Sequence, residues 1–218
     1  MTGPAIAVLG GTGQQGRGIT QRLAAAGASV VVGSRDPQRA AAAIAAWPAS
    51  ARPTSTTYAA AIASADVIVL AIPFESVGSV VEEHRGHFRA TALVVDVTVP
   101  LAFTAGTASL ATVPEGSAAE HIRSRLPSHV RLAATFKTVP AHLLSDVDQS
   151  LDCDEFVCGD SPPAREEASA LVQTIRGLRA VDVGPLVRAR AIEQLTLLAV
   201  NINRRHHIRA ARFRVVGL

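Results

Sequence analysis

A glycine-rich segment near the start of the chain constrains the fold more than any other feature of the sequence. Residues 11–16 read GTGQQG, which matches the pattern GxGxxG, and they follow the apolar run 6–9 and precede an Ala-rich stretch. A strand, a glycine turn and a helix in this order are typical of a dinucleotide-binding βαβ unit. A glycine-rich loop that only turns the chain is the alternative. The residues predicted to hold a pyrophosphate are Gly11, Thr12, Gly13, Gln14, Gln15 and Gly16.

Each glycine of this motif has a predicted task. Gly11 permits the tight turn, Gly13 lets backbone amides approach a pyrophosphate, and Gly16 lets the helix pack closely on the strand. The first turn of the helix then supplies oriented N–H donors and a partial positive charge to the phosphates.

Short β-branched runs alternate with Ala-rich stretches over the first half of the chain. Such alternation predicts a parallel sheet with helices on both faces, which is an α/β fold of the doubly wound Rossmann type. Asp36 is placed to cap the second helix, and Pro37 stands in its first turn. The predicted strands are 5–10, 29–33, 67–72 and 93–97. The predicted helices are 15–26, 37–47, 57–63 and 74–84.

The second half of the chain continues with the same kinds of element. Ser117 and Glu120 have the spacing of a capping box for a short helix. We place a domain boundary near residue 134, which gives a dinucleotide-binding Rossmann domain over 1–134 and a smaller C-terminal α/β substrate domain over 135–218. The strands predicted here are 130–134, 156–158, 178–183 and 211–216, and the helices are 140–144, 162–176 and 186–205.

The end of the second predicted strand discriminates between NADP and NAD. NAD sites place a carboxylate there, whereas NADP sites need cations and hydroxyls for the 2′-phosphate. In this chain Ser34, Arg35 and Arg39 follow the strand, and Thr12 of the glycine turn can assist them. Asp36 is the one discordant charge, but as a helix cap it would point into its own helix. The sequence therefore predicts NADP(H) as the cofactor.

Two further strand ends are predicted to meet the nicotinamide half of the cofactor, because ligands of such sheets lie across the carboxyl ends of the strands. Ile72 and Pro73 end one strand, and Thr98 follows the next. Their apolar and hydroxyl groups are candidates to line the nicotinamide and its ribose. The alternative is that the prolines only terminate strands.

Composition excludes several classes of function. With 218 residues and 48% hydrophobic content, the chain can bury a sizeable core. No apolar run reaches the roughly 18 residues of a membrane span, so we expect no membrane partner and a cytoplasmic location.

Cys153 and Cys158 lack zinc-ligand spacing, which predicts buried thiols and no metal site. The arginine-rich stretch 176–214 has few aromatic residues to stack on bases, which disfavours nucleic acid; it is either a solvated face or a seat for an anionic ligand.

Segments spread over nearly the whole chain match one known family. The N-terminal segments are GGTGQQGRG and VVVGSR, with Arg39 where the family keeps a basic residue. The later segments are 71–76 (AIPFES), 116–122 (GSAAEHI), 152–160 (DCDEFVCGD), 177–186 (GLRAVDVGPL) and 193–205 (EQLTLLAVNINRR). Together they resemble the NADPH-dependent reductases of the 5-deazaflavin coenzyme F420, also called F420H2:NADP oxidoreductases.

This resemblance implies both the architecture and the chemistry. The family has a Rossmann domain, a smaller C-terminal domain, and a deazaflavin ring stacked on the nicotinamide in the cleft between them. Hydride passes directly between the two rings, so catalysis depends on positioning in a dry cleft more than on acid or base groups. Coenzyme F420 carries a phosphodiester and a glutamate tail, which suits the arginine-rich end of this chain. The implied activity is hydride transfer between NADP(H) and F420, a small anionic redox partner.

Two segments depart from the family pattern. Lys137, the only lysine of the chain, stands where the family usually has a histidine beside the deazaflavin, and 187–189 replaces Ser-Asn-Ser. We predict Lys137 as the catalytic residue, either as a point charge for the coenzyme's phosphate or as a proton donor. A surface lysine without a function is the alternative. A proton donor would favour an NADPH-dependent reductase of another small acceptor, such as a carbonyl, an imine or a metal chelate. An NADPH sensor without catalysis is the third class.

The predicted C-terminal helix also bears on assembly. Its apolar positions are candidates to continue a core across two chains, which predicts a homodimer, although the same residues could pack inside one subunit. These positions are Leu195, Leu198, Ala199 and Ile202.

Overall fold

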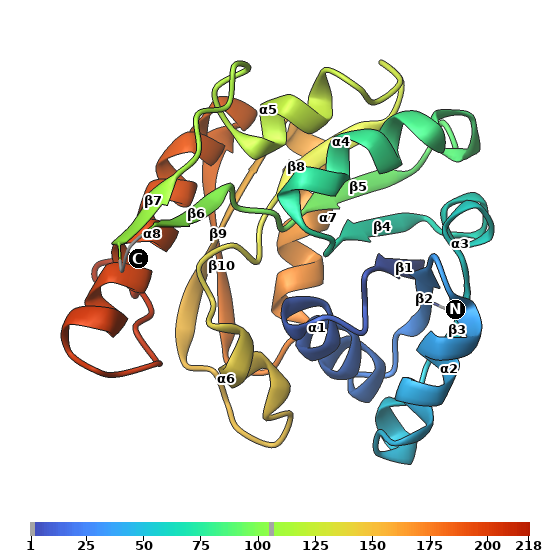
Figure 1. Ribbon diagram of the computed structural model, residues 1–218, viewed down its shortest axis with the longest axis horizontal. Helices are drawn as coiled ribbons and strands as arrows, with labels where there is room; N and C mark the ends of the chain where they lie inside the picture. The colour runs from blue at the N-terminus through green and yellow to red at the C-terminus, as the bar shows by residue number, and fades with distance from the viewer. Residues whose placement is uncertain (1–2, 105–106) are drawn as a thin grey trace.

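A single mixed sheet forms the centre of the protein, as the computed structural model shows for residues 3–104 and 107–218 (Figure 1). Its strand order is β10-β9-β8-β5-β4-β1-β2-β3. The strands are β1 (Ala5–Leu9), β2 (Ser29–Ser34), β3 (Thr54–Thr57), β4 (Val67–Leu70), β5 (Leu93–Asp96), β8 (Arg131–Ala134), β9 (Cys153–Gly159) and β10 (Leu178–Pro185).

The strand directions define a doubly wound core with an antiparallel extension. From β3 through β2, β1, β4 and β5 to β8, each strand runs parallel to its neighbour. This is the strand order of a Rossmann fold, in which the direction of winding reverses beside β1. β9 then pairs antiparallel with β8, and β10 runs parallel to β9. The sheet therefore continues beyond residue 134, and the domain boundary placed there stays a prediction.

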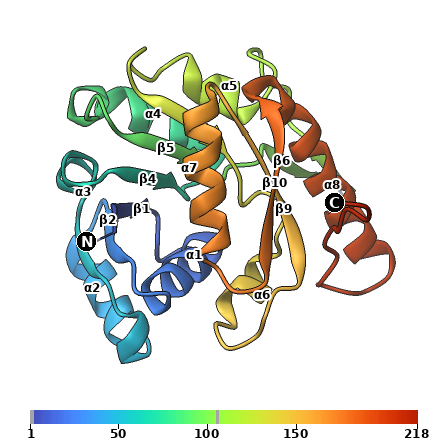
Figure 2. The ribbon, with the colours of Figure 1, turned by 180° about the vertical axis from the view of Figure 1, so that it is seen from behind.

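Helices cover both faces of this sheet. In Figure 1, α4 and α5 lie above β4 and β5 and α1 lies below β1, and Figure 2 shows α7 in front of the sheet. The helices are α1 (Gln14–Ala25), α2 (Pro37–Ala45), α3 (Tyr58–Ser64), α4 (Phe74–Glu83), α5 (Ala118–Arg123), α6 (Ala141–Ser145), α7 (Pro162–Gln173) and α8 (Ala189–Arg205), with 3-10 turns η1 (Ala49–Ala51), η2 (Arg85–His87) and η3 (Leu186–Arg188).

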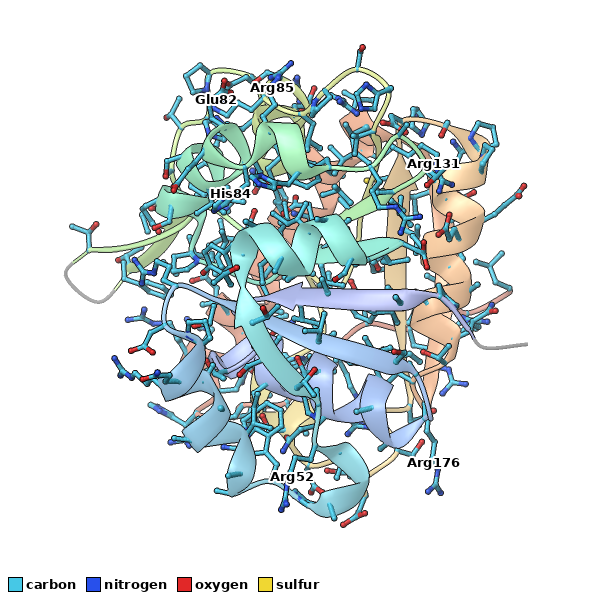
Figure 3. The ribbon with its side chains drawn as sticks, turned by 90° about the vertical axis from the view of Figure 1, so that its right-hand side faces the viewer. Arg52, Glu82, His84, Arg85, Arg131 and Arg176 are labelled. Atoms are coloured by element: carbon cyan, nitrogen blue, oxygen red, sulfur yellow. The ribbon has the colours of Figure 1, made fainter. Side chains whose placement is uncertain are left out.

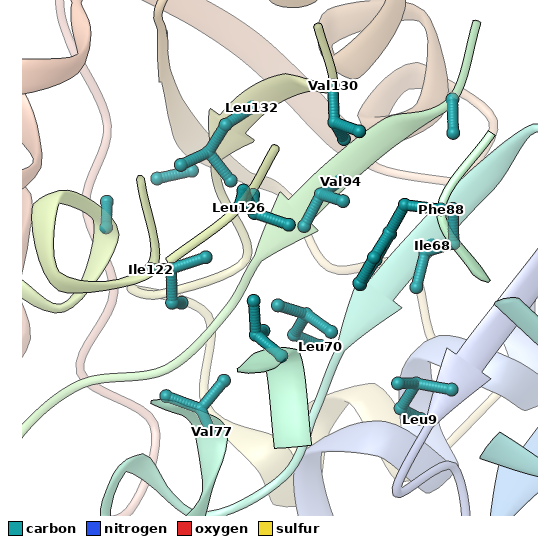
Figure 4. Close-up of a cluster of buried hydrophobic side chains, with 14 of the residues drawn as sticks. Leu9, Ile68, Leu70, Val77, Phe88, Val94, Ile122, Leu126, Val130 and Leu132 are labelled. Atoms are coloured by element: carbon teal, nitrogen blue, oxygen red, sulfur yellow. The ribbon is translucent and has the colours of Figure 1, made fainter. Parts of the chain in front are cut away.

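Alternation along the strands builds two cores, because successive side chains of a strand point to opposite faces. Ala7 and Leu9 of β1 belong to the core under α3, α4 and α5. Ile6 and Val8 belong to the core under α1, α6 and α7. Figure 4 shows part of the first core, to which Leu70 of β4 and Val77 of α4 both belong. Burial on both faces explains why these strands read as continuous apolar runs.

Local capping follows the sequence closely. The side chain of Asp36 accepts a hydrogen bond of 3.0 Å from Arg39 N–H at the start of α2. Ser117 Oγ accepts from Glu120 N–H at 3.1 Å and donates to the Glu120 carboxylate at 2.8 Å at the start of α5. Both predicted caps are confirmed. Among the described residues, no helix is both long and apolar enough to cross a lipid bilayer.

Three elements differ from the prediction. β3 and the antiparallel hairpin of β6 (Leu101–Thr104) and β7 (Thr107–Leu110) have no counterpart among the predicted strands. The strand predicted at 211–216 is wrong, because this segment has no regular structure. It lies along the edge of β9, where Asp154 N–H donates to Phe213 O and the Asp154 carboxylate accepts from Val215 N–H. A backbone bond and side-chain bonds hold the segment there, without the regular ladder of a strand.

Candidate active site

The glycine turn between β1 and α1 presents unpaired backbone donors. Gly13 N–H donates to Gly10 O at 2.9 Å, and the first helical bond runs from Arg17 N–H to Gly13 O at 2.8 Å. The amides of residues 14–16 therefore precede the helical ladder and face the end of the sheet. A Cβ added to Gly16 would lie 2.4 Å from Gly10 O, so the helix packs on the turn as closely as the motif predicts.

The side chain of Gln15 does not serve this turn. Its Nε2 donates to Phe136 O at 2.8 Å and to Val139 O at 3.4 Å. The side chain of Gln15 joins α1 to the segment 136–139. Only its backbone amide is therefore available for the predicted contact with a pyrophosphate. Sequence reasoning missed this link, since the two partners are more than a hundred residues apart.

An adenosine-side cavity of about 440 Å³ lies at the end of β2. It brings together Thr12, Ser34, Arg35 and Arg39, the four residues predicted there. The carboxylate of Asp36 faces its own helix, as predicted. Among the described residues no carboxylate forms an ion pair with Arg35 or Arg39, so both guanidinium groups are available to an anion.

Small side chains and one aromatic residue complete this cavity, and the sequence argument missed them. Ala40 and Ala43 of α2 line it together with Tyr58 of α3. Alanines on the cavity side of a helix leave room for a flat base, and the helical spacing of three residues is a signal that could have identified them. Burial raises the pKa of Tyr58, so its hydroxyl keeps its proton and can donate.

A second cavity, of about 560 Å³, lies across the ends of β4 and β5. It adjoins the adenosine-side cavity through Gly13, Ile72 and Pro73, which line both. The remaining predicted residues that line it are Gln14, Gln15, Thr98 and Lys137. Gly11 and Gly16 line neither cavity and support the turn from behind. The two cavities together form a continuous path for an extended dinucleotide over the first turn of α1.

Thr98 is held in one orientation at the floor of this second cavity. Asp96 Oδ1 accepts hydrogen bonds from Thr98 N–H at 2.8 Å and from Thr98 Oγ1 at 2.7 Å. The hydroxyl proton therefore points toward Asp96, and the oxygen keeps lone pairs that can accept from a ligand. An acid at the end of a buried strand was a signal for this role that sequence reasoning did not use.

Lys137 is buried, so the interpretation as a surface lysine is wrong. Its side chain is 0% exposed, and Nζ donates to Asp96 Oδ2 at 2.7 Å, to Glu193 Oε1 at 3.4 Å and to Thr98 O. These acceptors use all three ammonium protons. Burial opposes the charge, but the Asp96 and Glu193 carboxylates more than offset it and raise the pKa of Lys137. A catalytic role for Lys137 stays a prediction, and proton donation would require its amine to leave these acceptors.

The backbone around Lys137 is fixed by a second buried acid. Glu155 Oε1 accepts from Lys137 N–H at 2.8 Å, while its Oε2 accepts from Thr138 Oγ1 at 2.9 Å and from Val139 N–H at 3.0 Å. Burial raises the pKa of Glu155 to about 7, although these hydrogen bonds lower it. On the other side, Thr196 Oγ1 of α8 donates to Lys137 O at 3.0 Å. Glu155 was missed, although an acid inside a buried strand is unusual enough to mark it.

Several predicted features lie outside these cavities. The segment 187–189 lines neither of them. Cys153 and Cys158 are free and buried as predicted, and burial raises the pKa of their thiols to about 11 and about 12. Within the described parts of the chain, no group of three or more His, Cys, Asp or Glu side chains could hold a metal ion.

The fold and the site define the class of protein. The sheet has a Rossmann strand order, and the glycine turn has free amides. A cation-lined adenosine cavity adjoins a second cavity over the ends of β4 and β5. These features together are typical of dinucleotide-dependent oxidoreductases.

Comparison with known proteins gives the family. A family model described as "NADP oxidoreductase coenzyme F420-dependent" matches residues 5–100. The F420-dependent NADP reductase of Methanothermobacter thermautotrophicus is 37% identical over 98% of this chain and 95% of its own length. That of Methanocaldococcus jannaschii is 32% identical over 98% of both chains. A solved structure from Arthrobacter sp. FB24, described as a "putative f420 dependent nadp-reductase", superimposes with a TM-score of 0.84 at 25% identity, covering 98% of this chain and 100% of that one.

The chain belongs to the family of F420-dependent NADP reductases. The resemblance seen in the sequence and the predicted Rossmann-type α/β fold are both confirmed.

Proposed function

We propose that this protein transfers hydride between NADP(H) and the deazaflavin coenzyme F420. The observation that carries the proposal is the pair of adjoining cavities in a chain of this family, one lined by Ser34, Arg35 and Arg39 and the other crossing the ends of β4 and β5. Membership of the family makes the chain an oxidoreductase, and its relatives are named for the two coenzymes predicted here.

The residues present fit NADP(H). The amides of residues 14–16 bind the pyrophosphate, and no Cβ fits at Gly16 without displacing Gly10 O. Arg35 and Arg39 bind the 2′-phosphate, because they are the cations nearest the end of β2 and have no carboxylate partner among the described residues. The unphosphorylated dinucleotide would leave both cations without a partner.

The second cavity fits two stacked rings. Ile72 and Pro73 give it an apolar wall, and the lone pairs that Thr98 Oγ1 keeps would accept from the carboxamide of a bound nicotinamide. When bound, the nicotinamide and the deazaflavin supply the hydride chemistry themselves. The protein fixes the separation of the rings and excludes water, and most of the exposed surface inside this cavity is contributed by apolar atoms.

Lys137 acts in this proposal as a positioning residue. Its ammonium group holds the carbonyl of Thr98 and the carboxylate that orients the Thr98 hydroxyl. Reduction of a carbonyl or an imine needs a proton at the heteroatom, whereas transfer to the deazaflavin does not require one from this lysine. Because the three protons of Nζ are already donated to Asp96, Glu193 and Thr98 O, this arrangement favours F420 over the other small acceptors.

The assembly and the compartment form the remaining part of the proposal. Leu198 of α8 is 49% exposed and Phe103 of the neighbouring hairpin is 64% exposed, so both are available to a second copy in a homodimer. Static light scattering would then give twice the chain mass of 22.6 kDa, and Leu198→Glu would halve it. A monomeric wild type would contradict the dimer.

We place the enzyme in the cytoplasm, as its composition predicts.

The activity has a direct optical test. Mixing the protein with NADPH and oxidised F420 should bleach the visible deazaflavin band, and NADH should support a far lower rate. An NADPH sensor would bind the cofactor and leave the band unchanged. Consumption of NADPH with an imine or a ketone, but not with F420, would replace the proposal with the other reductase function.

A further inference from the structure

A third cavity, of about 610 Å³, opens on the other side of the glycine turn. One wall is the turn and the start of α1, and a second wall is the start of α6, which lies next to α1 (Figure 1). The third wall is the segment that follows α8, including Ile208 and Arg209. The dinucleotide path described above passes the same turn, since Thr12, Gly13 and Gln14 also line this third cavity, but its α6 and C-terminal walls lie outside the adenosine-side cavity.

The lining of the third cavity is basic and contains no acid. Arg17, His142 and Arg209 contribute to it, and none of its described lining residues is Asp or Glu. Arg17 lies over the ring of Trp47, with 5.7 Å between the guanidinium carbon and the ring centroid, which steadies its position beside the turn. Positive side chains around a concave surface concentrate field lines and attract anions.

Several arginines elsewhere on the surface pair with carboxylates, whereas Arg209 pairs with none in the described part of the chain. Arg131 pairs with Glu167 and Arg179 with Asp154, for example. Figure 3 shows Arg85 close to Glu82, whose ion pair measures 3.8 Å. No carboxylate among the described residues forms an ion pair with Arg209. Its charge is therefore available to a ligand.

Asn203 joins this cavity to the second one, because it lines both. Its Oδ1 accepts from Ala211 N–H at 2.9 Å, so its Nδ2 is the end left to donate to a ligand. A molecule whose ring occupies the second cavity can extend past Asn203 into the third.

We propose that the third cavity is an anion subsite, in which Arg209 and Asn203 bind the phosphate or carboxylate groups on the tail of the hydride-exchanging partner. The inference rests on the proposed function and extends it, since it assigns the tail of the second substrate to a defined wall of the protein. The other source of the same chemistry is the pyrophosphate of NADPH, which also lies near Gly13.

Two acceptors and one variant distinguish these sources. The acceptors are F420 with its phosphate and glutamate tail, and a 5-deazaflavin that ends at the ribityl hydroxyl. Arg209→Ala should raise the KM for F420 about fivefold, and it should leave the KM for the tail-less deazaflavin and the Kd for NADPH unchanged. Arg176→Ala is the matched control, because Arg176 is exposed, lines none of the cavities described here and points away from the sheet (Figure 3).

The outcomes separate this inference from the function on which it rests. A weaker Kd for NADPH with equal effects on both acceptors would assign Arg209 to the pyrophosphate and overturn the subsite. Equal KM values for F420 in the wild type and Arg209→Ala would also overturn it, with the hydride-transfer function intact. If the wild type reduces neither deazaflavin, the proposed function fails and the subsite fails with it.

Discussion

Replacing Lys137 by methionine should destabilise the protein strongly, because it leaves buried carboxylates without their cation. The Asp96 side chain is 0% exposed and that of Glu193 is 2% exposed. Breaking a buried ion pair by removing one partner costs about 3–5 kcal/mol, since the other charge stays desolvated. Burial raises the pKa of Glu193, so this acid can take up a proton when Lys137 is absent. Asp96 then carries most of the cost, and we expect a loss of about 3 kcal/mol.

The charge argument predicts a rescue. Lys137→Met combined with Asp96→Asn removes both charges and keeps an amide oxygen that can accept from Thr98, so we expect the double variant to recover about 2 kcal/mol. Urea unfolding followed by circular dichroism measures both values, and an unchanged m-value would show that the comparison is valid. Arg176→Met is the control at an exposed arginine and should change stability by less than about 0.5 kcal/mol.

Turnover separates positioning from proton donation in the same variants. If Lys137 is a positioning residue, we expect the double variant to regain much of the kcat that Lys137→Met loses, because the structure around Thr98 in the second cavity is restored. If Lys137 is a proton donor, we expect the double variant to stay inactive whatever its stability. A cost below about 1 kcal/mol for Lys137→Met would refute the buried-pair reasoning. A double variant no more stable than the single one would show that charge is not the cause.

Two further predictions address the cofactor and pH. Arg35→Ala should weaken NADPH binding about tenfold and leave NADH binding unchanged, as measured by fluorescence titration, because only NADPH carries the 2′-phosphate; an equal loss for both cofactors would contradict the assignment. Since burial raises the pKa of Glu155 from 4.5 to about 7, the folded protein keeps a proton there that the unfolded chain releases. Stability from this group should therefore fall as pH rises from about 4.5 to 7. Unfolding at both ends of this range should show a flatter dependence for Glu155→Gln, and an unaltered slope would exclude Glu155 as the cause.

The cofactor half of the site was predictable because its determinants are local. The turn, the caps and the cations at the end of β2 lie within one βαβ unit, where spacing alone fixes which side chains meet. Asp36 illustrates this, since its helix-capping bond to the residue three positions later explains why it does not oppose a phosphate. The parallel strands were also predictable, because burial on both faces of the sheet gives them continuous apolar runs in the sequence.

The substrate half was less predictable because long-range contacts build it. Lys137 donates to Asp96, forty-one residues earlier, and to Glu193, fifty-six residues later. The sequence near Lys137 therefore contains no signal that this lysine is buried. The segment 211–216 alternates apolar and basic residues like a strand, yet the carboxylate of Asp154 and the guanidinium of Arg179 take its backbone groups. The short β3 lacks a strong apolar pattern because it lies at the sheet edge.

The segment 136–139 is the piece on which both halves depend. Gln15 holds its carbonyls from the cofactor turn, Glu155 holds its amides from β9, and Asp96 holds its ammonium group from β5. Each support comes from a different element, so the segment has little freedom to move relative to the end of the sheet. Hydride transfer needs that rigidity, because the donor and acceptor carbons react only at close approach. It follows that Gln15, though part of a phosphate-binding motif, also sets the geometry of the cavity that receives the second ring.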